Sequence, residues 1–172
     1  NQCKKQNYNY IVRPKHLSKD YVSAYKVIEN VIKKLKSRFD YLIYLEPTSP
    51  FRKLNDLKKS CFQIVKKKAN SCWSVNKVSK KYHPKKIFIN LKGNLKLYEK
   101  GGENIIARQQ LGEIYQRNGI FYIFKTNELI KEKKIYLKKT IFHVIDYQHF
   151  NIDTLDDLKK TRKLAKKFKF HG

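Results

Sequence analysis

The chain of 172 residues contains no methionine and only three cysteines, and it has no long apolar run. A membrane span needs about 20 consecutive apolar residues, so we expect no transmembrane helix and no membrane partner. No secretory signal is visible. Cys3, Cys61 and Cys72 are odd in number and widely spaced, which argues against a disulfide framework and a zinc site. These absences predict a reduced, cytoplasmic location, and the lack of an initial methionine predicts a fragment or a processed product.

Acidic residues are scarce as well, since 14 of them stand against 40 basic residues and the formal net charge is +26. Such an excess of positive charge can indicate a nucleic-acid partner. Arginine, which contacts bases and phosphates in a bidentate manner, is nevertheless rare, and the lysines are spread through the whole chain. The pattern favours a solvated, lysine-rich surface, with a basic nucleic-acid-binding module as the alternative.

The rest of the composition is that of one folded domain. Apolar residues make up 41% of the chain and aromatic residues 13%, which argues against disorder and supplies a core. Strands are predicted over residues 8–12, 41–45, 71–78, 119–124 and 140–146, and a hairpin over 87–98. Helices are predicted over 21–36, 56–69 and 127–131 and from Thr154 onward. Strands that alternate with helices predict an α/β fold.

The stretch D-Y-L-I-Y-L-E-P-T-S-P-F-R, at residues 40–52, combines a strand, a polar loop and the start of a helix. Its apolar run predicts a strand that is buried on both faces of a parallel sheet. Two prolines then stiffen the loop that follows. Because ligands bind at the carboxyl ends of strands in open α/β sheets, chemistry is expected here, at Glu46, Thr48, Ser49 and Arg52.

The same stretch resembles the L-x-P-T-S-P-L-R motif of the acylneuraminate cytidylyltransferases, the CMP-sialic acid synthetases. Four further segments resemble motifs of that family in the same order: R-P-K-H-L-S-K-D at 13–20, H-P-K-K at 83–86, A-R-Q-Q-L-G-E-I-Y-Q-R-N-G-I-F-Y-I at 107–123 and F-N-I-D-T-L-D-D-L at 150–158. The resemblance implies a Rossmann-like nucleotidyltransferase domain of the nucleotide-diphospho-sugar transferase type. It also implies a mixed sheet with a β-rich dimerisation insertion over residues 77–102.

The family transfers CMP from CTP to the anomeric hydroxyl of a nonulosonic acid such as sialic acid, and it releases pyrophosphate. The resemblance therefore implies a cytidylyltransferase of surface glycan biosynthesis. CTP and a nonulosonic acid would be its substrates, Mg²⁺ its cofactor, and a second copy of the chain its partner in a homodimer.

Matching the motifs residue by residue implies roles in substrate binding. Arg13 matches an arginine near the cytidine end of the nucleotide. Ser49 and Thr48 are expected to bond to the sugar or to the backbone, with a role as loop caps as the alternative. Arg108 matches the arginine that binds the sugar carboxylate, and it is a catalytic candidate. Glu46 stands where many members have a sugar-contacting glutamine. An ionised carboxylate cannot donate a hydrogen bond and repels an anionic sugar, so Glu46 predicts a nonulosonic acid other than ordinary sialic acid, such as legionaminic acid.

Two further matches concern the dimer and the long strand. Lys86 matches a lysine that the family donates across the dimer interface. Asn118 and Gly119 open the predicted strand as the N-G of the family does. A second family arginine falls at Gln116 in this register, so Arg117 receives no strong assignment.

The last motif implies the metal site. Asp153 matches the second aspartate of D-I-D and is predicted to be the principal Mg²⁺ ligand and a catalytic residue. Asn151 stands where the first aspartate would be, and it is predicted to be a weaker or water-mediated ligand, because an amide oxygen carries no charge. The alternative for Asp153 is that it caps the last helix, a role for which Thr154 also qualifies.

One part of the family pattern is missing. Members begin with a strand and a basic loop, P-A-R-x-x-S-K-x-x-x-x-K-N, which wraps the triphosphate, and nothing in residues 1–12 resembles it. We therefore expect residues 1–172 to form a single cytidylyltransferase domain without its N-terminal nucleotide-binding loop. Such a chain is not expected to turn over CTP alone. The alternative is a catalytically incomplete fragment that only binds sugar or dimerises.

Overall fold

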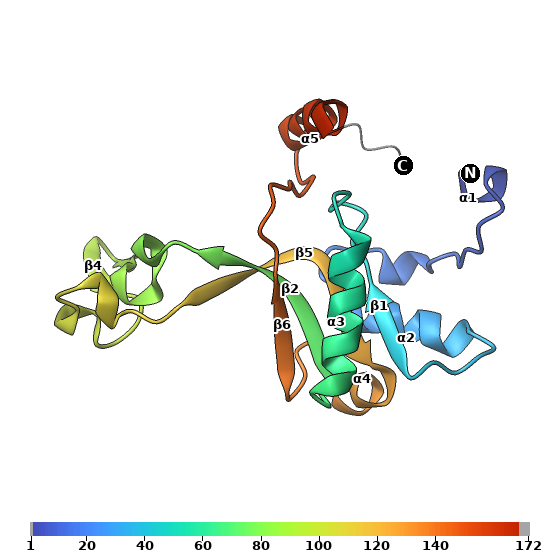
Figure 1. Ribbon diagram of the computed structural model, residues 1–172, viewed down its shortest axis with the longest axis horizontal. Helices are drawn as coiled ribbons and strands as arrows, with labels where there is room; N and C mark the ends of the chain where they lie inside the picture. Colours follow the sequence, from blue (N-terminus) through green and yellow to red (C-terminus); the bar gives the residue numbers. More distant parts are fainter. Residues whose placement is uncertain (1, 169–172) are drawn as a thin grey trace.

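The computed structural model describes residues 2–168, and its centre is a four-stranded mixed sheet (Figure 1). The strand order is β1 (Tyr41–Tyr44), β5 (Ile114–Lys125), β2 (Ser71–Val78) and β6 (Thr140–Val144). β5 runs antiparallel to both of its neighbours, whereas β6 is parallel to β2. The α/β class and the mixed sheet predicted from the sequence are confirmed.

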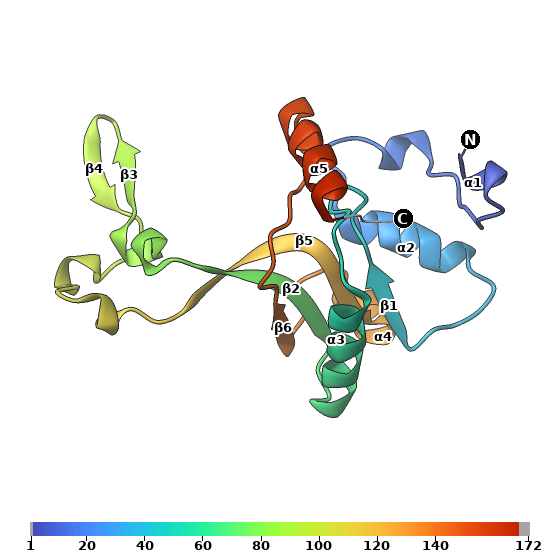
Figure 2. The same cartoon turned by 45° about the horizontal axis from the view of Figure 1, so that its top comes forward.

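α3 (Leu54–Lys66) packs on one face of this sheet, and α2 (Ala24–Lys34) and α4 (Thr126–Glu132) pack on the other. The other two helices, α1 (Gln2–Lys5) and α5 (Leu155–Phe168), stand away from the sheet (Figures 1 and 2). Successive side chains of a strand point to opposite faces, so β5 serves two cores. Phe121 and Ile123 pack in one core with Ile64 of α3, while Tyr122 and Phe124 pack in the other with Ile28 of α2.

β2 and β5 continue beyond the sheet as a twisted pair of strands and carry an arm that projects from the body (Figures 1 and 2). The arm holds the hairpin of β3 (Phe88–Leu91) and β4 (Asn94–Leu97), as predicted for residues 87–98. Short 3₁₀ turns surround it: η2 (Lys80–Tyr82), η3 (Pro84–Lys86), η4 (Gly102–Asn104) and η5 (Arg108–Gln110).

The arm exposes many apolar side chains: Tyr82, Ile87, Phe88, Ile89, Leu91, Leu95, Tyr98 and Ile106. An isolated two-stranded hairpin is only marginally stable in water, so this surface is the one that the predicted dimer contact would bury. Dimerisation through residues 77–102 stays a prediction.

Two predictions about strands were wrong. Residues 8–12 form no strand, although Tyr8 and Val12 suit one, because no described strand lies beside them to pair with. β1 is not buried on both faces of a parallel sheet. It pairs antiparallel with β5 at the edge of the sheet, and Ile43 is 44% exposed.

The helix ends also differ from the prediction. α2 is shorter than the predicted 21–36, and η1 (Lys15–Leu17) precedes it. α3 begins at Leu54, two residues before the predicted start at Asp56. Asp56 instead faces β6, where its Oδ1 lies 3.1 Å from His143 Nε2.

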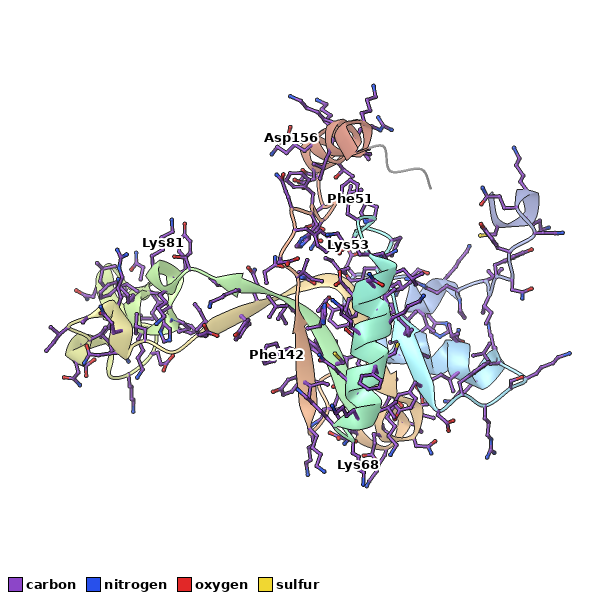
Figure 3. The ribbon with its side chains drawn as sticks, in the orientation of Figure 1. Phe51, Lys53, Lys68, Lys81, Phe142 and Asp156 are labelled. Atoms are coloured by element: carbon purple, nitrogen blue, oxygen red, sulfur yellow. The ribbon has the colours of Figure 1, made fainter. Side chains whose placement is uncertain are left out.

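The lysine side chains are distributed over the whole molecule. Figure 3 shows Lys53 near the start of α3, Lys68 beyond its end and Lys81 on the arm. No described helix is long and apolar enough to cross a membrane. Cys3, Cys61 and Cys72 are free thiols.

Candidate functional site

A bulge in β5 shapes the candidate site. The pairing with β2 shifts there: Trp73 lies opposite Tyr122, but Val75 lies opposite Arg117. Between these two pairs, β5 therefore has more residues than β2, which is the definition of a bulge. Within the bulge, Gly119 takes a left-handed φ of 73°. A Cβ atom at Gly119 would lie 2.7 Å from Glu46 Oε2, so the absence of a side chain lets Glu46 approach the bulge.

The loop after β1 is tied to the segment that precedes α5. Ser49 Oγ donates a hydrogen bond to Asn151 Oδ1 at 2.8 Å, and the Ile152 amide donates to the Thr48 carbonyl at 2.8 Å. Arg52 Nη2 donates to the Glu46 carbonyl at 2.6 Å, which closes the loop on itself. The loop therefore holds Glu46 and Asn151 at the same end of the sheet.

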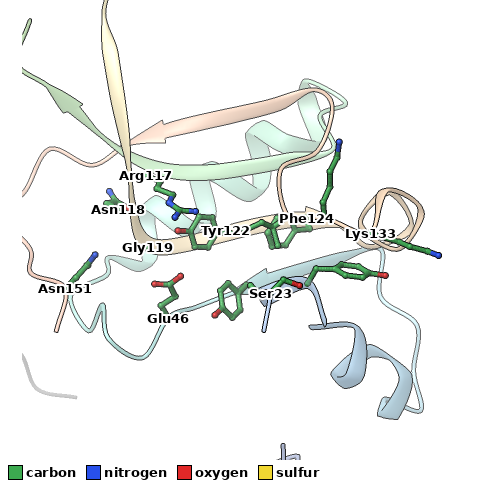
Figure 4. A pocket seen from close by; sticks show the side chains of 14 residues that line it. Ser23, Glu46, Arg117, Asn118, Gly119, Tyr122, Phe124, Lys133 and Asn151 are labelled. Carbon is green, nitrogen blue, oxygen red and sulfur yellow. The ribbon is translucent and has the colours of Figure 1, made fainter. Parts of the chain in front are cut away.

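These segments line a cavity of about 580 Å³ (Figure 4). Glu46, Arg117, Asn118, Gly119 and Asn151 form its polar end. The other end is basic, since Lys133 and Lys134 lie there beside Ile135, Ser23, Ala24 and Tyr25. Such a size suits a small ligand with several polar groups.

Aromatic rings form the wall between the two ends. The ring centroids of Tyr44 and Tyr122 are 5.9 Å apart with an interplanar angle of 25°, and Phe124 stacks beyond them at 6.4 Å from Tyr122. Trp73 meets Tyr122 edge-on at 5.0 Å from behind. An apolar aromatic wall of this kind can pack against the C–H groups of a sugar ring, while polar groups at the two ends can bond to the substituents of the sugar.

The electrostatics of the polar end are mixed. Burial raises the pKa of the Glu46 carboxyl, the nearby Asp153 carboxylate raises it further, and the Arg117 guanidinium opposes both. Burial, with the Glu46 charge beside it, raises the pKa of Tyr122 to about 12, so this phenol is a neutral hydrogen-bonding group near neutral pH. The polar end of the cavity thus offers one carboxyl, one guanidinium and uncharged hydrogen-bonding groups.

The structure brings several of the predicted site residues together. Glu46, Asn118, Gly119 and Asn151 line the cavity, and Ser49 is buried next to them through its bond to Asn151. Arg13 is exposed, and its charge acts on the pKa of Tyr44, which places it near the aromatic wall.

Arg108 and Lys86 do not line this cavity. Arg108 lies in η5 and Lys86 in η3, both exposed on the arm that projects from the sheet. Within one copy of the chain, the arm therefore presents these two cations away from the polar end.

Arg117, Tyr44 and Tyr122 line the cavity although no motif match assigned them a role. The bulge brings Arg117 to the cavity, because it breaks the register from which a linear motif match is counted. The alternation of β5 offered a signal for Tyr122, which points to the α2 face together with Phe124.

Thr154, not Asp153, caps α5. Its Oγ1 accepts a hydrogen bond from the Asp157 amide at 3.2 Å, and the Asp157 carboxylate accepts in return from the Thr154 amide at 3.0 Å and from its hydroxyl at 2.8 Å. This reciprocal pattern is a capping box. Asp153 is exposed and its charge reaches Glu46, so it is free of the capping role.

The donors near the cavity fit a magnesium ion that takes most of its ligands from phosphate and water. In the described part of the chain, no three His, Cys, Asp or Glu side chains gather as a metal cage. Mg²⁺ commonly binds through only one or two carboxylates and substrate phosphates. Asp153 supplies a solvent-accessible carboxylate, and the Asn151 oxygen has a second lone pair beyond its bond to Ser49.

Comparison with known proteins supports the fold. No family model matches the chain. The post-translational flagellin modification protein B of Campylobacter coli is 24% identical over 162 residues, which are 91% of this chain and 68% of that protein. A CMP:2-keto-3-deoxy-manno-octonic acid synthetase complexed with CTP superposes with a TM-score of 0.58 at 12% identity, covering 87% of this chain and 70% of its own.

A putative glucose-1-phosphate thymidylyltransferase from Bacillus anthracis, in complex with a sucrose, also has a TM-score of 0.58. It is 10% identical and covers 96% of this chain and 68% of its own. The two structures confirm the predicted nucleotide-diphospho-sugar transferase fold.

Proposed function

We propose that this protein is a cytidylyltransferase that transfers CMP from CTP to a nonulosonic acid and releases pyrophosphate. The cavity between β1 and the β5 bulge is the single observation that carries the proposal. It joins an aromatic wall to a polar end at the loop after β1, which is the edge where α/β folds bind ligands. The fold neighbours support it, because both are named as sugar nucleotide-forming enzymes.

An acidic sugar fits the charges of the cavity. Arg117 lies at the polar end and can bind a carboxylate by charge-assisted hydrogen bonds. The neighbour complexed with CTP is named for a 2-keto acid sugar, which carries such a carboxylate. Lys133 and Lys134 add positive charge at the opposite end.

Glu46 narrows the choice of sugar. Its carboxyl lies against the bulge beside Gly119 and acts electrostatically with Arg117. An ionised carboxylate accepts hydrogen bonds only, so it favours substituents that donate, such as amide N–H groups. Because many members of the family have a sugar-contacting glutamine at this position, we propose a nonulosonic acid other than ordinary sialic acid, such as legionaminic acid. The flagellin-modification name of the curated relative supports a surface glycan as its destination.

The reaction forms a bond between the anomeric oxygen and the α-phosphorus of CTP and breaks the bond from that phosphorus to pyrophosphate. The hydroxyl proton passes to solvent water as its oxygen attacks the α-phosphorus. Positioning and charge neutralisation are what such a transfer needs from a protein. Arg13 is proposed at the cytidine end, and Asp153 with Asn151 is proposed to hold Mg²⁺, which would neutralise phosphate charge when bound.

We also propose that two copies associate through their arms. The exposed apolar side chains of the hairpin motivate this proposal, as do the positions of Arg108 and Lys86 on the same arm. Both cations would then act on the cavity of the partner copy, where Arg108 would add to the binding of the sugar carboxylate. Sedimentation of the chain as a monomer at micromolar concentration would contradict this arrangement.

A substrate panel tests the proposed reaction. The chain preceded by a family nucleotide-binding loop, P-A-R-x-x-S-K-x-x-x-x-K-N, would be incubated with Mg²⁺, each of the four nucleoside triphosphates, and either nonulosonic acids or aldose 1-phosphates. The sugar nucleotides would be identified by mass spectrometry, and the 172-residue chain without that loop should form none. Formation of a CMP-nonulosonic acid alone is expected. Products formed from aldose 1-phosphates would overturn the proposal. Binding of the sugar without turnover would instead support a sugar-binding fragment.

In the same assay, Arg117→Ala tests whether Arg117 binds the sugar carboxylate. Arg162→Ala, on the exposed surface of α5, is its matched control. Loss of a hydrogen bond to a charged group corresponds to roughly ten- to hundredfold in affinity. The sugar KM of Arg117→Ala should rise by that factor while the CTP KM stays unchanged. An equal rise for both variants would mean that only the overall positive charge matters.

A further inference from the structure

Side-chain hydrogen bonds connect the bulge at the cavity to a histidine outside its lining. Asn118 Nδ2 donates to Asn76 Oδ1 at 2.9 Å, and Asn76 Nδ2 lies 3.4 Å from His149 Nε2. His149 Nδ1 in turn lies 3.2 Å from the Tyr147 carbonyl oxygen. Asn118 lines the cavity, whereas Asn76 and His149 do not. Three side chains from three segments thus form one line of contacts.

The direction of every bond in this line is determined at its two ends. A backbone carbonyl only accepts, so the proton on the ring must be on Nδ1 of His149 to meet the Tyr147 oxygen. In a neutral ring, Nε2 is then an acceptor, and it faces the amide N–H of Asn76.

At the other end, the orientation of the Asn118 amide is set by a backbone donor. Its Oδ1 receives the Ile120 backbone N–H at 3.2 Å. The Ser74 hydroxyl lies 2.6 Å from the same oxygen and 2.9 Å from the Phe121 carbonyl, and it can donate to either. Turning the amide over would place its NH₂ group against the Ile120 N–H. Nδ2 of Asn118 therefore has to donate toward Asn76, which matches the sense required by His149.

The line also joins the two walls of the cavity's polar end. Asn118 and Gly119 belong to the β5 bulge, whereas His149 lies two residues before Asn151, which receives the Ser49 hydroxyl. Ser74 fills the gap beside the bulge, where it also accepts the Phe121 amide at 3.0 Å. A shift of His149 would therefore be transmitted to the bulge and to the segment that carries Asn151.

We infer that His149, acting through Asn76, is a positioning residue for the Asn118–Gly119 bulge and thereby for the ligand in the cavity. Its Nδ1 faces the Tyr147 carbonyl and its Nε2 faces the Asn76 amide, so the geometry selects the Nδ1–H tautomer of the uncharged ring. The effect on catalysis rests on the proposed function, but the tautomer and the hydrogen-bond line do not. His149 touches neither the cavity nor the reacting groups, so it is not a catalytic residue.

Nitrogen-15 NMR of the whole chain tests the line independently of any activity. At a pH where the ring is uncharged, the proton of His149 is expected on Nδ1 and not on Nε2. His143 is an internal control of the opposite kind, because its Nε2 faces the Asp56 carboxylate, an acceptor, at 3.1 Å. A His149 ring protonated on Nε2 would overturn the inference, whatever reaction the protein catalyses.

Substitutions then separate positioning from packing. His149→Ala removes the acceptor and should shift the side-chain amide signals of both Asn76 and Asn118. It should also weaken sugar binding about two- to tenfold, the range that one net hydrogen bond represents. His149→Gln offers an amide oxygen in place of Nε2 and should restore most of both readouts, whereas His149→Leu should not.

The outcomes can be distinguished. Unchanged Asn118 signals and unchanged sugar affinity in His149→Ala would overturn the positioning role. Equal losses in the Gln and Leu variants would assign His149 a packing role and overturn it as well. If the signals shift as expected and no nonulosonic acid binds to the unsubstituted protein, the proposed function fails while the hydrogen-bond line stands.

Discussion

Gly119→Ala is the change that most directly probes how the bulge and the loop after β1 fit together. Gly119 has a φ of 73°, and an L-residue in this left-handed region costs roughly 1–2 kcal/mol. The new Cβ would also lie 2.7 Å from Glu46 Oε2 and 3.4 Å from Ser49 Oγ. The nearest atom ends a flexible side chain, so Glu46 can move away at a cost of about 0.5–1.5 kcal/mol if it leaves its rotamer.

The free energy of unfolding is therefore expected to fall by roughly 1.5–3.5 kcal/mol, the sum of the two ranges. Each kcal/mol lowers the Tm of a chain of this size by about 2–4 °C. Gly93→Ala is the matched control, because Gly93 has a φ of 88° and no atom lies within 4 Å of the place that its new methyl group would take. It therefore reports the backbone cost alone, and urea denaturation of both variants gives the difference.

The double variant Glu46→Ala/Gly119→Ala isolates the contact. Without the Glu46 carboxyl, the second cost should disappear and the Gly119→Ala loss should approach that of Gly93→Ala. Sugar affinity should also fall in Gly119→Ala, since Glu46 is displaced from the cavity. Additive effects of the two substitutions, together with unchanged sugar affinity, would refute the close approach of Glu46 to the bulge.

Three further outcomes are expected. Burial raises the pKa of the Glu46 carboxyl, so the folded protein holds this proton to higher pH than the unfolded chain does. As the pH rises above 4.5, the unfolding free energy of the unsubstituted protein should therefore fall relative to that of Glu46→Gln. Urea titrations that show a constant difference between the two proteins would contradict this. Thr154→Ala should lose ~1 kcal/mol of unfolding free energy with its cap, whereas Asp153→Asn should melt like the unsubstituted protein; calorimetry checks both. Cys72 is fully buried, and burial raises the pKa of its thiol to about 11. Iodoacetamide at about pH 8 should therefore modify Cys3 and leave Cys72 unmodified until the protein unfolds, which mass spectrometry would show.

Local patterns predicted much of the fold. The strand over residues 71–78 has the bounds that its β-branched, aromatic and buried positions indicated, and the hairpin around Gly93 lies where its turn residues placed it. The strand predicted over 8–12 failed because strand propensity is realised only next to a pairing partner.

The position of β5 between β1 and β2 could not be predicted in the same way. A central strand reads as a continuous apolar run whether its neighbours are parallel or antiparallel, so the run at 119–124 carried no information on direction. The predicted strand also began too late, because residues 114–118, which end in the polar residues Gln116, Arg117 and Asn118, continue the strand toward the arm.

The candidate site was predicted in part for a similar reason. Glu46 and Asn118 follow from their places at a strand end and in a motif, and they line the cavity. Arg117 depends on the bulge, which no count along the chain reveals. Arg108 and Lys86 lie on an arm whose direction is set by the twist of β2 and β5, a property of paired strands that single residues do not encode.

An NMR titration of the nitrogen-15-labelled chain with a nonulosonic acid tests the central claim most directly. We predict that amide shift changes gather at the cavity, on residues 44–46, 117–122 and 151, and that Arg117→Ala weakens them. Shift changes spread over the lysine-rich surface, or confined to the arm, would show that the acid binds only as an anion or elsewhere. Either result would contradict the assignment of the cavity as the sugar site.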